Sequence, residues 1–206
     1  MSDLDKVDLL RGWDCYGWRN AIAILERVHP KEWTDTLEIL GSFKLLHSDL
    51  IAKGKGNKSA IAAAIDSKFY DRGWKEHKFE TSIVVDGVAS ESPTHAVDCF
   101  RDKVALELEW NNKDPFFDRD LNNFRLLFDL RIADAGIVVT RSTQLQSWLK
   151  QNHKLFGKQP ETYGVSTTHM EKLRPKIVGG GAGGCPVAVF SMTPELYVDD
   201  RGKSGT

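Results

Sequence analysis

The segment from Val97 to Trp110 constrains the fold most, because it predicts a β-hairpin that carries three acidic side chains. In its second arm, apolar side chains alternate with Glu107 and Glu109, so both glutamates lie on one face of a strand. Asp98 lies directly opposite Glu107 if the reversal at residues 101–104 has an even number of loop residues. Three carboxylates in one small patch are typical of a Mg²⁺ site.

Two points about this hairpin stay open. An odd loop would put Asp98 on the opposite face, and Asp102-Lys103 is not a favoured two-residue turn. The glutamates could also form the solvated face of an antiparallel sheet. Against that, Leu, Ala, Val and Trp dominate the arm, as in an inner strand, where grouped acids repel one another unless a cation or a proton intervenes. The next residues, 111–120, are dense in hydrogen-bonding groups.

Composition favours a single globular domain. The chain has 206 residues, of which 41% are hydrophobic, enough for one sizeable core. No apolar run approaches the roughly 20 residues that a membrane span needs, and the first residues lack the pattern of a signal peptide. Cys15, Cys99 and Cys185 are widely spaced, which predicts reduced thiols and indicates neither a disulfide framework nor a zinc site. We therefore expect a cytoplasmic protein.

The formal net charge of −1 argues against a non-specific nucleic-acid binder, because that class usually carries an excess of Lys and Arg. If DNA is the partner, positive charge must be concentrated locally, and affinity must rest on shape, base contacts and metal. The loop at residues 53–58 offers such a patch through Lys55, Asn57 and Lys58. A solvated linker is the plainer interpretation of that loop.

The periodicity predicts a mixed α/β domain in three parts. Residues 1–72 are expected to be mainly helical, with apolar stripes at helical spacing. Residues 73–145 form the core, where the hairpin, a helix and a buried parallel strand at 135–140 make a βαβ crossover. Residues 146–206 add the C-terminal helix, a glycine-rich loop and a late strand at 187–192.

Two more segments carry weaker signals. Residues 81–85 predict a strand that ends at an Asp86-Gly87 turn. The glycine-rich segment at 179–184 is either a hinge or a place where the backbone approaches a ligand closely. It lacks the Gly-Lys-Ser/Thr ending of a nucleotide-binding loop, so we expect no NTP site there.

The hairpin motif resembles that of a known nuclease superfamily. Asp98, followed nine residues later by Glu107-Leu108-Glu109, is similar to the metal motif of PD-(D/E)xK nucleases. More narrowly, the chain resembles type II restriction endonucleases of the BglII, BstYI and BamHI group. One position departs from the superfamily: Glu109 stands where most members have Lys, whereas BamHI has Glu and BglII and BstYI have Gln.

The similarity extends beyond the motif. Gly73-Trp74-Lys75-Glu76 before a strand, the helix after the hairpin, the strand at 135–139 and the late strand after Cys185 all have counterparts in this group. The likeness covers residues 50–145 well and residues 176–192 more weakly. In the N-terminal helices only the pattern is shared.

The resemblance implies a restriction-endonuclease-like mixed central β-sheet flanked by helices, and Mg²⁺-dependent hydrolysis of double-stranded DNA. It implies one or two Mg²⁺ ions per active site and a homodimer in which each subunit cuts one strand of a short palindrome. Members of the group share a GATC core in their sites, so a related palindrome is a reasonable hypothesis. A prokaryotic cytoplasmic location and a companion DNA methyltransferase, not a stable subunit, are implied as well.

The resemblance also assigns roles at the active site. Asp98 and Glu107 match the metal ligands, and Glu109 matches the residue that orients or deprotonates the attacking water. With glutamate in place of lysine, the identity of the general base stays open. Glu76 or His77 matches an auxiliary polar position beside the metal, although a lone histidine is more often structural.

For base reading, the matching positions lie just after the active strand and at the tip of the next strand. Asn can bind adenine, and Arg or Lys can bind guanine, in the major groove. These positions are Asn111, Asn112, Lys113, Arg141, Ser142 and Thr143.

Three alternatives remain at this point. The same fold could serve a structure-selective or repair nuclease that cuts junctions or damaged DNA. It could be a non-catalytic DNA-binding module that lost turnover, although grouped carboxylates argue against an idle site. The third alternative is an unrelated α/β protein in which Asp98, Glu107 and Glu109 merely face water.

Overall fold

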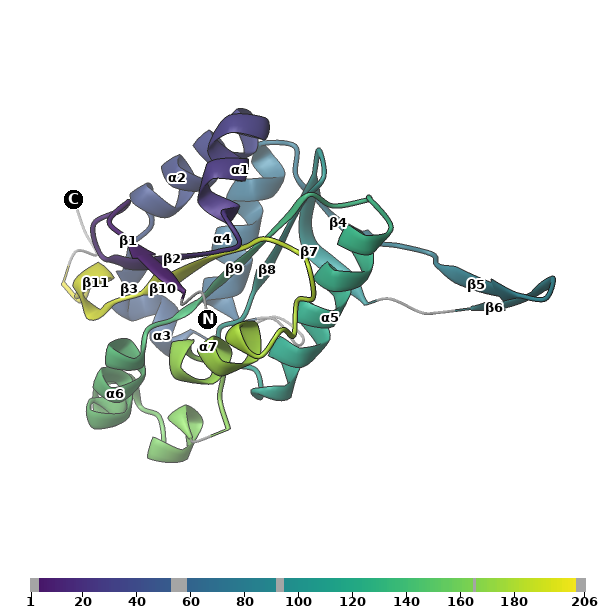
Figure 1. Ribbon diagram of the computed structural model, residues 1–206. Coiled ribbons are helices and arrows are strands. Elements are labelled where there is room, and N and C mark those ends of the chain that lie inside the picture. The colour runs from purple at the N-terminus through teal and green to yellow at the C-terminus, as the bar shows by residue number, and fades with distance from the viewer. Residues whose placement is uncertain (1–3, 53–58, 92–94, 165, 203–206) are drawn as a thin grey trace.

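A seven-stranded mixed sheet forms the centre of the protein, in the order β1-β2-β10-β9-β8-β7-β4 (Figure 1). The computed structural model describes residues 4–52, 59–91, 95–164 and 166–202. Strands β8, β9 and β10 run parallel, and their outer neighbours pair antiparallel. The strands are β1 (Asp5–Val7), β2 (Trp13–Trp18), β4 (Lys75–Lys78), β7 (Ala96–Arg101), β8 (Val104–Leu108), β9 (Ala135–Arg141) and β10 (Val187–Met192).

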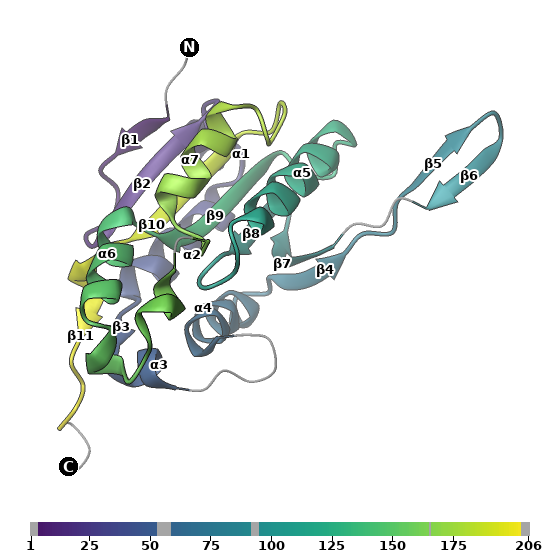
Figure 2. The same ribbon diagram turned by 90° about the horizontal axis from the view of Figure 1, so that it is seen from below.

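Helices cover both faces of this sheet (Figure 2). One core contains apolar residues of α1 (Ala21–Val28), α2 (Pro30–Ser42) and α4 (Ala60–Asp71). The other contains apolar residues of α5 (Pro115–Asp129) and α7 (Met170–Val178). The remaining elements are β3 (Leu45–Leu46), α3 (His47–Ile51), α6 (Thr143–Gln151), the 3-10 helices η1 (His153–Phe156), η2 (Pro160–Tyr163) and η3 (Pro194–Leu196), and β11 (Tyr197–Val198).

The predicted βαβ unit is present as β8, α5 and β9, and β8 pairs with β9 in parallel. Helix α5 packs directly onto β9 where Gly136 leaves room for the ring of Phe124. A Cβ atom at Gly136 would lie 2.5 Å from that ring, so only glycine permits this close approach. This contact thereby fixes α5 over the sheet at β9.

The glycine-rich segment at 179–184 packs against the same helix. A Cβ atom at Gly181 would lie 3.1 Å from Leu121, and one at Gly183 would lie 2.8 Å from Arg125. Gly183 also has a positive φ of 57°, a conformation that other residues rarely adopt. The structure thus shows a close approach of this segment to α5, whereas the sequence predicted a hinge or a close approach to a ligand, and neither of these is tested.

The N-terminal residues correct one prediction. Residues 5–18 contain β1 and β2 where helix was expected, and β2 pairs with β10 inside the sheet. Trp13 and Cys15 belong to one core, whereas Trp18 belongs to the other. Because apolar side chains lie on both faces of β2, with Asp14 as its one charged residue, its sequence lacks the regular polar alternation that identifies a half-buried strand.

Strands β5 (Ser82–Val85) and β6 (Val88–Glu91) form a separate two-stranded arm that projects from the body (Figure 1, Figure 2). The predicted strand at 81–85 is thus present, but it lies outside the central sheet. Val84, Val85 and Val88 are 64%, 62% and 68% exposed, so the arm buries little apolar surface of its own.

The cysteines agree with the prediction of reduced thiols. Cys15, Cys99 and Cys185 all lie in described segments, all are buried, and no disulfide joins them. Burial raises the pKa of Cys15 and of Cys185 to about 12. Among the described residues, no helix has both the length and the apolar character needed to cross a membrane.

Candidate active site

The β7–β8 hairpin makes two of the predicted acidic residues, Asp98 and Glu107, cross-strand neighbours. Its turn has two residues, 102–103, both with positive φ, although their sequence is not a favoured turn. The loop is therefore even, and the register continues to place Asp98 opposite Glu107. The backbone N–H of Asp98 donates to Glu107 Oε2 at 3.4 Å, and Asp98 Oδ2 accepts from the backbone N–H of Leu108 at 3.0 Å.

Glu107 and Glu109 are buried beneath α5, with 1% and 2% of their surface exposed. This burial contradicts the alternative in which they form a solvated face. Burial raises the pKa of Glu107, and the nearby carboxylates of Asp120 and Asp98 raise it further. The pKa of Glu109 is raised chiefly by burial and then by the carboxylate of Asp120. Such a group of acids is costly to keep charged without a cation.

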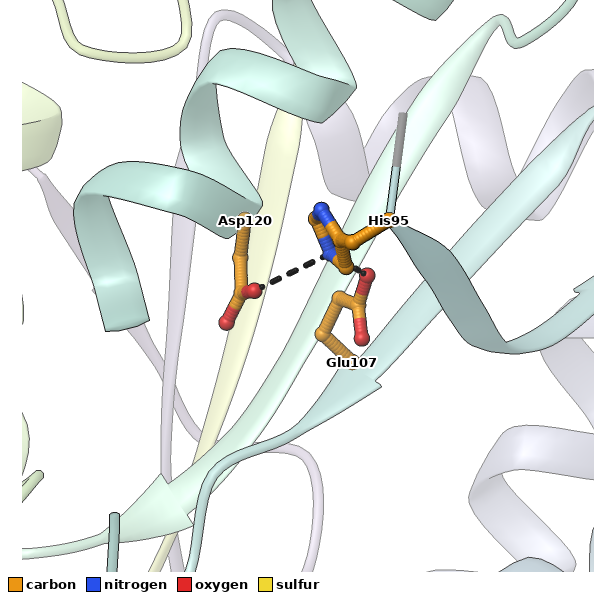
Figure 3. Close-up of side chains that lie close together, drawn as sticks. All are labelled: His95, Glu107 and Asp120. Carbon is orange, nitrogen blue, oxygen red and sulfur yellow. Dashed lines mark hydrogen bonds and ion pairs between the residues drawn. The ribbon is translucent and has the colours of Figure 1, made fainter. Parts of the chain in front are cut away.

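Two residues that the sequence analysis missed complete the cluster. His95 Nε2 lies 2.9 Å from Glu107 Oε1 and 3.2 Å from Asp120 Oδ1 (Figure 3). Burial lowers the pKa of His95, but its hydrogen bonds with Asp120 and Glu107 outweigh this effect and raise the pKa to about 9. His95, Glu107 and Asp120 offer ligand atoms that all lie within 4.8 Å of one another, so together they could hold a metal ion.

A signal for Asp120 was present in the sequence. Asp120 lies three residues after Phe117 and four before Phe124, which both belong to the buried face of α5. An acidic residue on an apolar helical stripe is unusual and indicates a buried polar partner. The sequence did not show which strand that stripe would cover, so the partner could not be named.

Glu109 is held by polar neighbours on two sides. Its Oε2 accepts a hydrogen bond of 2.8 Å from the side-chain amide of Asn112, and Arg119 Nη2 lies 3.7 Å from its Oε1. The backbone N–H of Glu109 continues the ladder of β8 and donates to Val139 at 2.8 Å. The carboxylate is thus oriented by groups other than lysine.

The loop after β8 is joined to the segment before α7. The carbonyl of Asn112 accepts from the N–H of Thr168 at 2.9 Å, and Lys113 forms a β-bridge with Thr167. The side chains of Asn111 and Lys113 are exposed, whereas Asn112 is half-buried because its amide turns toward Glu109. Of the three residues predicted to read bases here, two therefore have exposed side chains, and their role stays a prediction.

Arg141 corrects the prediction of direct base contact. It is fully buried, and its guanidinium donates to the carbonyl of Thr168 from Nε at 3.3 Å and from Nη2 at 3.0 Å. It also lies over the rings of Trp110 and Tyr163, at 5.1 Å and 5.8 Å from their centroids. Arg141 therefore does not face solvent. Its hydrogen bonds connect the end of β9 to the segment before α7.

Of the two residues after Arg141 that were predicted to contact DNA, one is buried and the other is exposed. Ser142 is buried and caps α6, because its Oγ accepts from the N–H of Leu145 at 3.0 Å. Thr143 is exposed and lines a cleft between α6 and α7, together with Lys150 and Lys172. Three further predicted contacts lie outside the described residues: Lys55, Asn57 and Lys58.

Glu76 and His77 lie on the edge strand β4, and both are exposed. The ring of His77 packs against Phe79 and Phe100, with centroids 4.3 Å and 6.0 Å apart. Such packing against aromatic rings is typical of a histidine with a structural role. A catalytic role for Glu76 or His77 stays a prediction.

The chain matches one known protein family over most of its length. A family model described as restriction endonuclease BglII/BglIII matches residues 13–192. No curated protein matches the chain in a sequence comparison. The family match contains β2, the carboxylate cluster and β10, so it covers the whole central part of the sheet.

Proposed function

Since the chain belongs to the BglII/BglIII family of restriction endonucleases, and is thereby a type II site-specific deoxyribonuclease, we propose that it cuts double-stranded DNA at a short palindrome in a Mg²⁺-dependent reaction. The observation that carries this proposal is the buried carboxylate cluster beside the end of β8. Carboxylate oxygens are the ligands that Mg²⁺ prefers.

The residues present fit a divalent cation. Glu107, Glu109 and Asp120 are buried acids, and the guanidinium of Arg119 is the nearby permanent positive charge that contacts Glu109 and Asp120. Removing several carboxylates from water is unfavourable unless cations compensate their charge. Asp98 and Glu107 are our proposed metal ligands, because the hairpin register presents them side by side.

Phosphodiester cleavage needs an activated water, neutralised charge on the scissile phosphate and a stabilised leaving oxygen. Bound Mg²⁺ would supply charge neutralisation and an acidified water at this position. Glu109 is the proposed residue that orients or deprotonates the attacking water. Burial and the carboxylate of Asp120 raise the pKa of Glu109, so a bound cation would be needed to keep this carboxylate ionised and able to accept a proton. Asn112 and Arg119 keep its carboxylate in place.

For DNA recognition, we assign the exposed side chains of Asn111, Lys113 and Thr143. Asn111 has donor and acceptor groups for a base edge, and Lys113 suits guanine or a phosphate. Lys150 and Lys172 line the cleft beside Thr143, together with Glu171, and give this cleft local positive charge for a phosphate. The proposed site is a palindrome that contains GATC, and the proposed assembly is a homodimer, since two-fold symmetric DNA is cut on both strands by two identical subunits.

The first test is a digest of a fully sequenced phage genome with Mg²⁺. We expect discrete fragments whose ends share one palindrome, cut symmetrically on both strands, and no cleavage after chelation of the metal. DNA from the source cell should resist the digest if a companion methyltransferase protects it. Fragment ends without a common sequence, or nicks confined to junctions, would favour a structure-selective or repair nuclease. Ends that share a palindrome lacking GATC would refute only that part of the proposal.

A second prediction concerns Asn112, which we assign as a positioning residue for Glu109. Asn112→Ala should lower kcat by about 10- to 100-fold with little change in KM, because residues that orient a metal-site carboxylate usually have effects of this size. The matched control is Asn111→Ala, which removes the exposed neighbour and should alter KM or site preference more than kcat. Steady-state cleavage of one oligonucleotide duplex measures both, and identical behaviour of the two variants would exclude the positioning role.

A further inference from the structure

Asp120 is the most unusual member of the carboxylate cluster. It lies on α5, it is fully buried, and Arg119 donates to its Oδ1 from Nε at 3.1 Å and from Nη2 at 2.9 Å. Its other oxygen, Oδ2, is buried and accepts no hydrogen bond from a described residue as long as the neighbouring carboxyl group of Glu109 is ionised. A buried carboxylate oxygen without a donor is unfavourable, so it indicates a partner that hydrogen bonds within the protein do not provide.

The spacing of the cluster suits a metal ion. His95 Nε2 lies 2.9 Å from an oxygen of Glu107 and 3.2 Å from an oxygen of Asp120. The ligand oxygens of Glu107 and Asp120 lie within 4.8 Å of each other, and two oxygens bound to one octahedral Mg²⁺ ion at about 2.1 Å are separated by about 3 to 4.2 Å. One oxygen of Asp120 and one oxygen of Glu107 face the imidazole of His95, which lies between α5 and β8 (Figure 3).

We propose that Asp120 is a further ligand of the divalent cation, binding it together with Glu107, and that His95 holds the two carboxylates in position before the cation enters. This inference rests on the proposed metal-dependent function and adds a ligand from α5, an element outside the hairpin motif. Cation binding would then connect the hairpin to α5, because one ligand comes from each side of the cluster.

The test uses Mn²⁺ as the probe and needs no DNA. The electron paramagnetic resonance signal of free Mn²⁺ reports the fraction bound to the full chain. Asp120→Asn should weaken Mn²⁺ binding by at least about tenfold, since even residues that only orient a metal ligand change affinity by about 10- to 100-fold. Asp118→Asn is the matched control, because Asp118 is an exposed acid on the same helix that pairs with Lys176. Equal affinity of Asp120→Asn and the native chain would overturn the proposal.

A change of metal preference separates coordination from a structural role. Asp120→Cys should raise the affinity for Cd²⁺ relative to Mn²⁺, because a thiolate is a soft ligand, while Asp118→Cys should not. Thermal unfolding provides the control for folding: Mn²⁺ should raise the Tm of the native chain and raise that of Asp120→Asn less. An unchanged Cd²⁺ to Mn²⁺ ratio in a folded Asp120→Cys variant would exclude direct coordination.

Mn²⁺ binding by Glu107→Gln, measured in parallel, distinguishes a failure of the further inference from a failure of the proposed metal site. If Glu107→Gln loses Mn²⁺ binding while Asp120→Asn keeps it, the further inference is wrong and the proposed metal site stands. If neither variant changes Mn²⁺ binding, the cation lies elsewhere, and the metal site under the proposed function is wrong as well.

Discussion

Glu107→Gln is expected to reduce DNA cleavage by at least about a thousandfold, because a metal site supplies several kcal/mol of transition-state stabilisation and this change removes a charged ligand. Glutamine has nearly the same shape as glutamate, so β8 and its buried face should remain packed. DNA binding should persist, since the proposed reading residues, Asn111, Lys113 and Thr143, lie on other segments. Single-turnover cleavage and a gel-shift assay in the absence of Mg²⁺ measure the two properties separately.

The matched control for this variant is Glu26→Gln. Glu26 lies on α1 and its side chain is 58% exposed beside Arg27, so the same chemical change there should leave cleavage unchanged. A Glu107→Gln variant that cleaves at the native rate would remove Glu107 from the site. Parallel loss of cleavage and of DNA binding would instead point to a structural defect.

Asp35→Ala is expected to lower the free energy of unfolding by about 3 kcal/mol, because it leaves buried polar partners without their acceptor. Asp35 on α2 accepts from Arg72 at 2.9 Å, from Arg101 of β7 at 3.0 Å and from the indole N–H of Trp74 at 3.3 Å. Trp74 is 1% exposed and cannot find water as a replacement. Thermal unfolding should show a decrease in Tm of roughly 6–12 °C for a chain of this size.

Glu38→Ala provides the comparison for Asp35→Ala. Glu38 also accepts from Arg72, at 2.7 Å, but its side chain is 56% exposed. Exposed ion pairs contribute roughly 0–1 kcal/mol, so the Tm of Glu38→Ala should stay near the native value. If both variants lost similar stability, burial of Asp35 would not be the reason for its effect. Through its hydrogen bond with Arg101, Asp35 connects α2 to β7, the strand that carries Asp98. We therefore expect Asp35 to stabilise the position of the active-site strand without contacting the site.

Much of the core could be predicted from the sequence, because its signals are local. The helix at α5, the strands β9 and β10, and the alternation that puts Glu107 and Glu109 on one face follow from periodicity over short segments. The hairpin turn at residues 102–103 was harder, since its two residues adopt positive φ without the usual Asn-Gly or Asp-Gly sequence. The strand β2 was missed because apolar side chains lie on both of its faces.

The sequence by itself determined the α/β class, the hairpin and the spacing of Asp98, Glu107 and Glu109, because each depends on residues close together in the chain. Only the tertiary structure decided that α5 covers this hairpin face and brings Asp120 to His95 and Glu107. It also decided that Arg141 turns inward to Thr168. These contacts depend on how segments distant in the chain pack together. The spacing of apolar side chains along one helix does not show which strand that helix will cover.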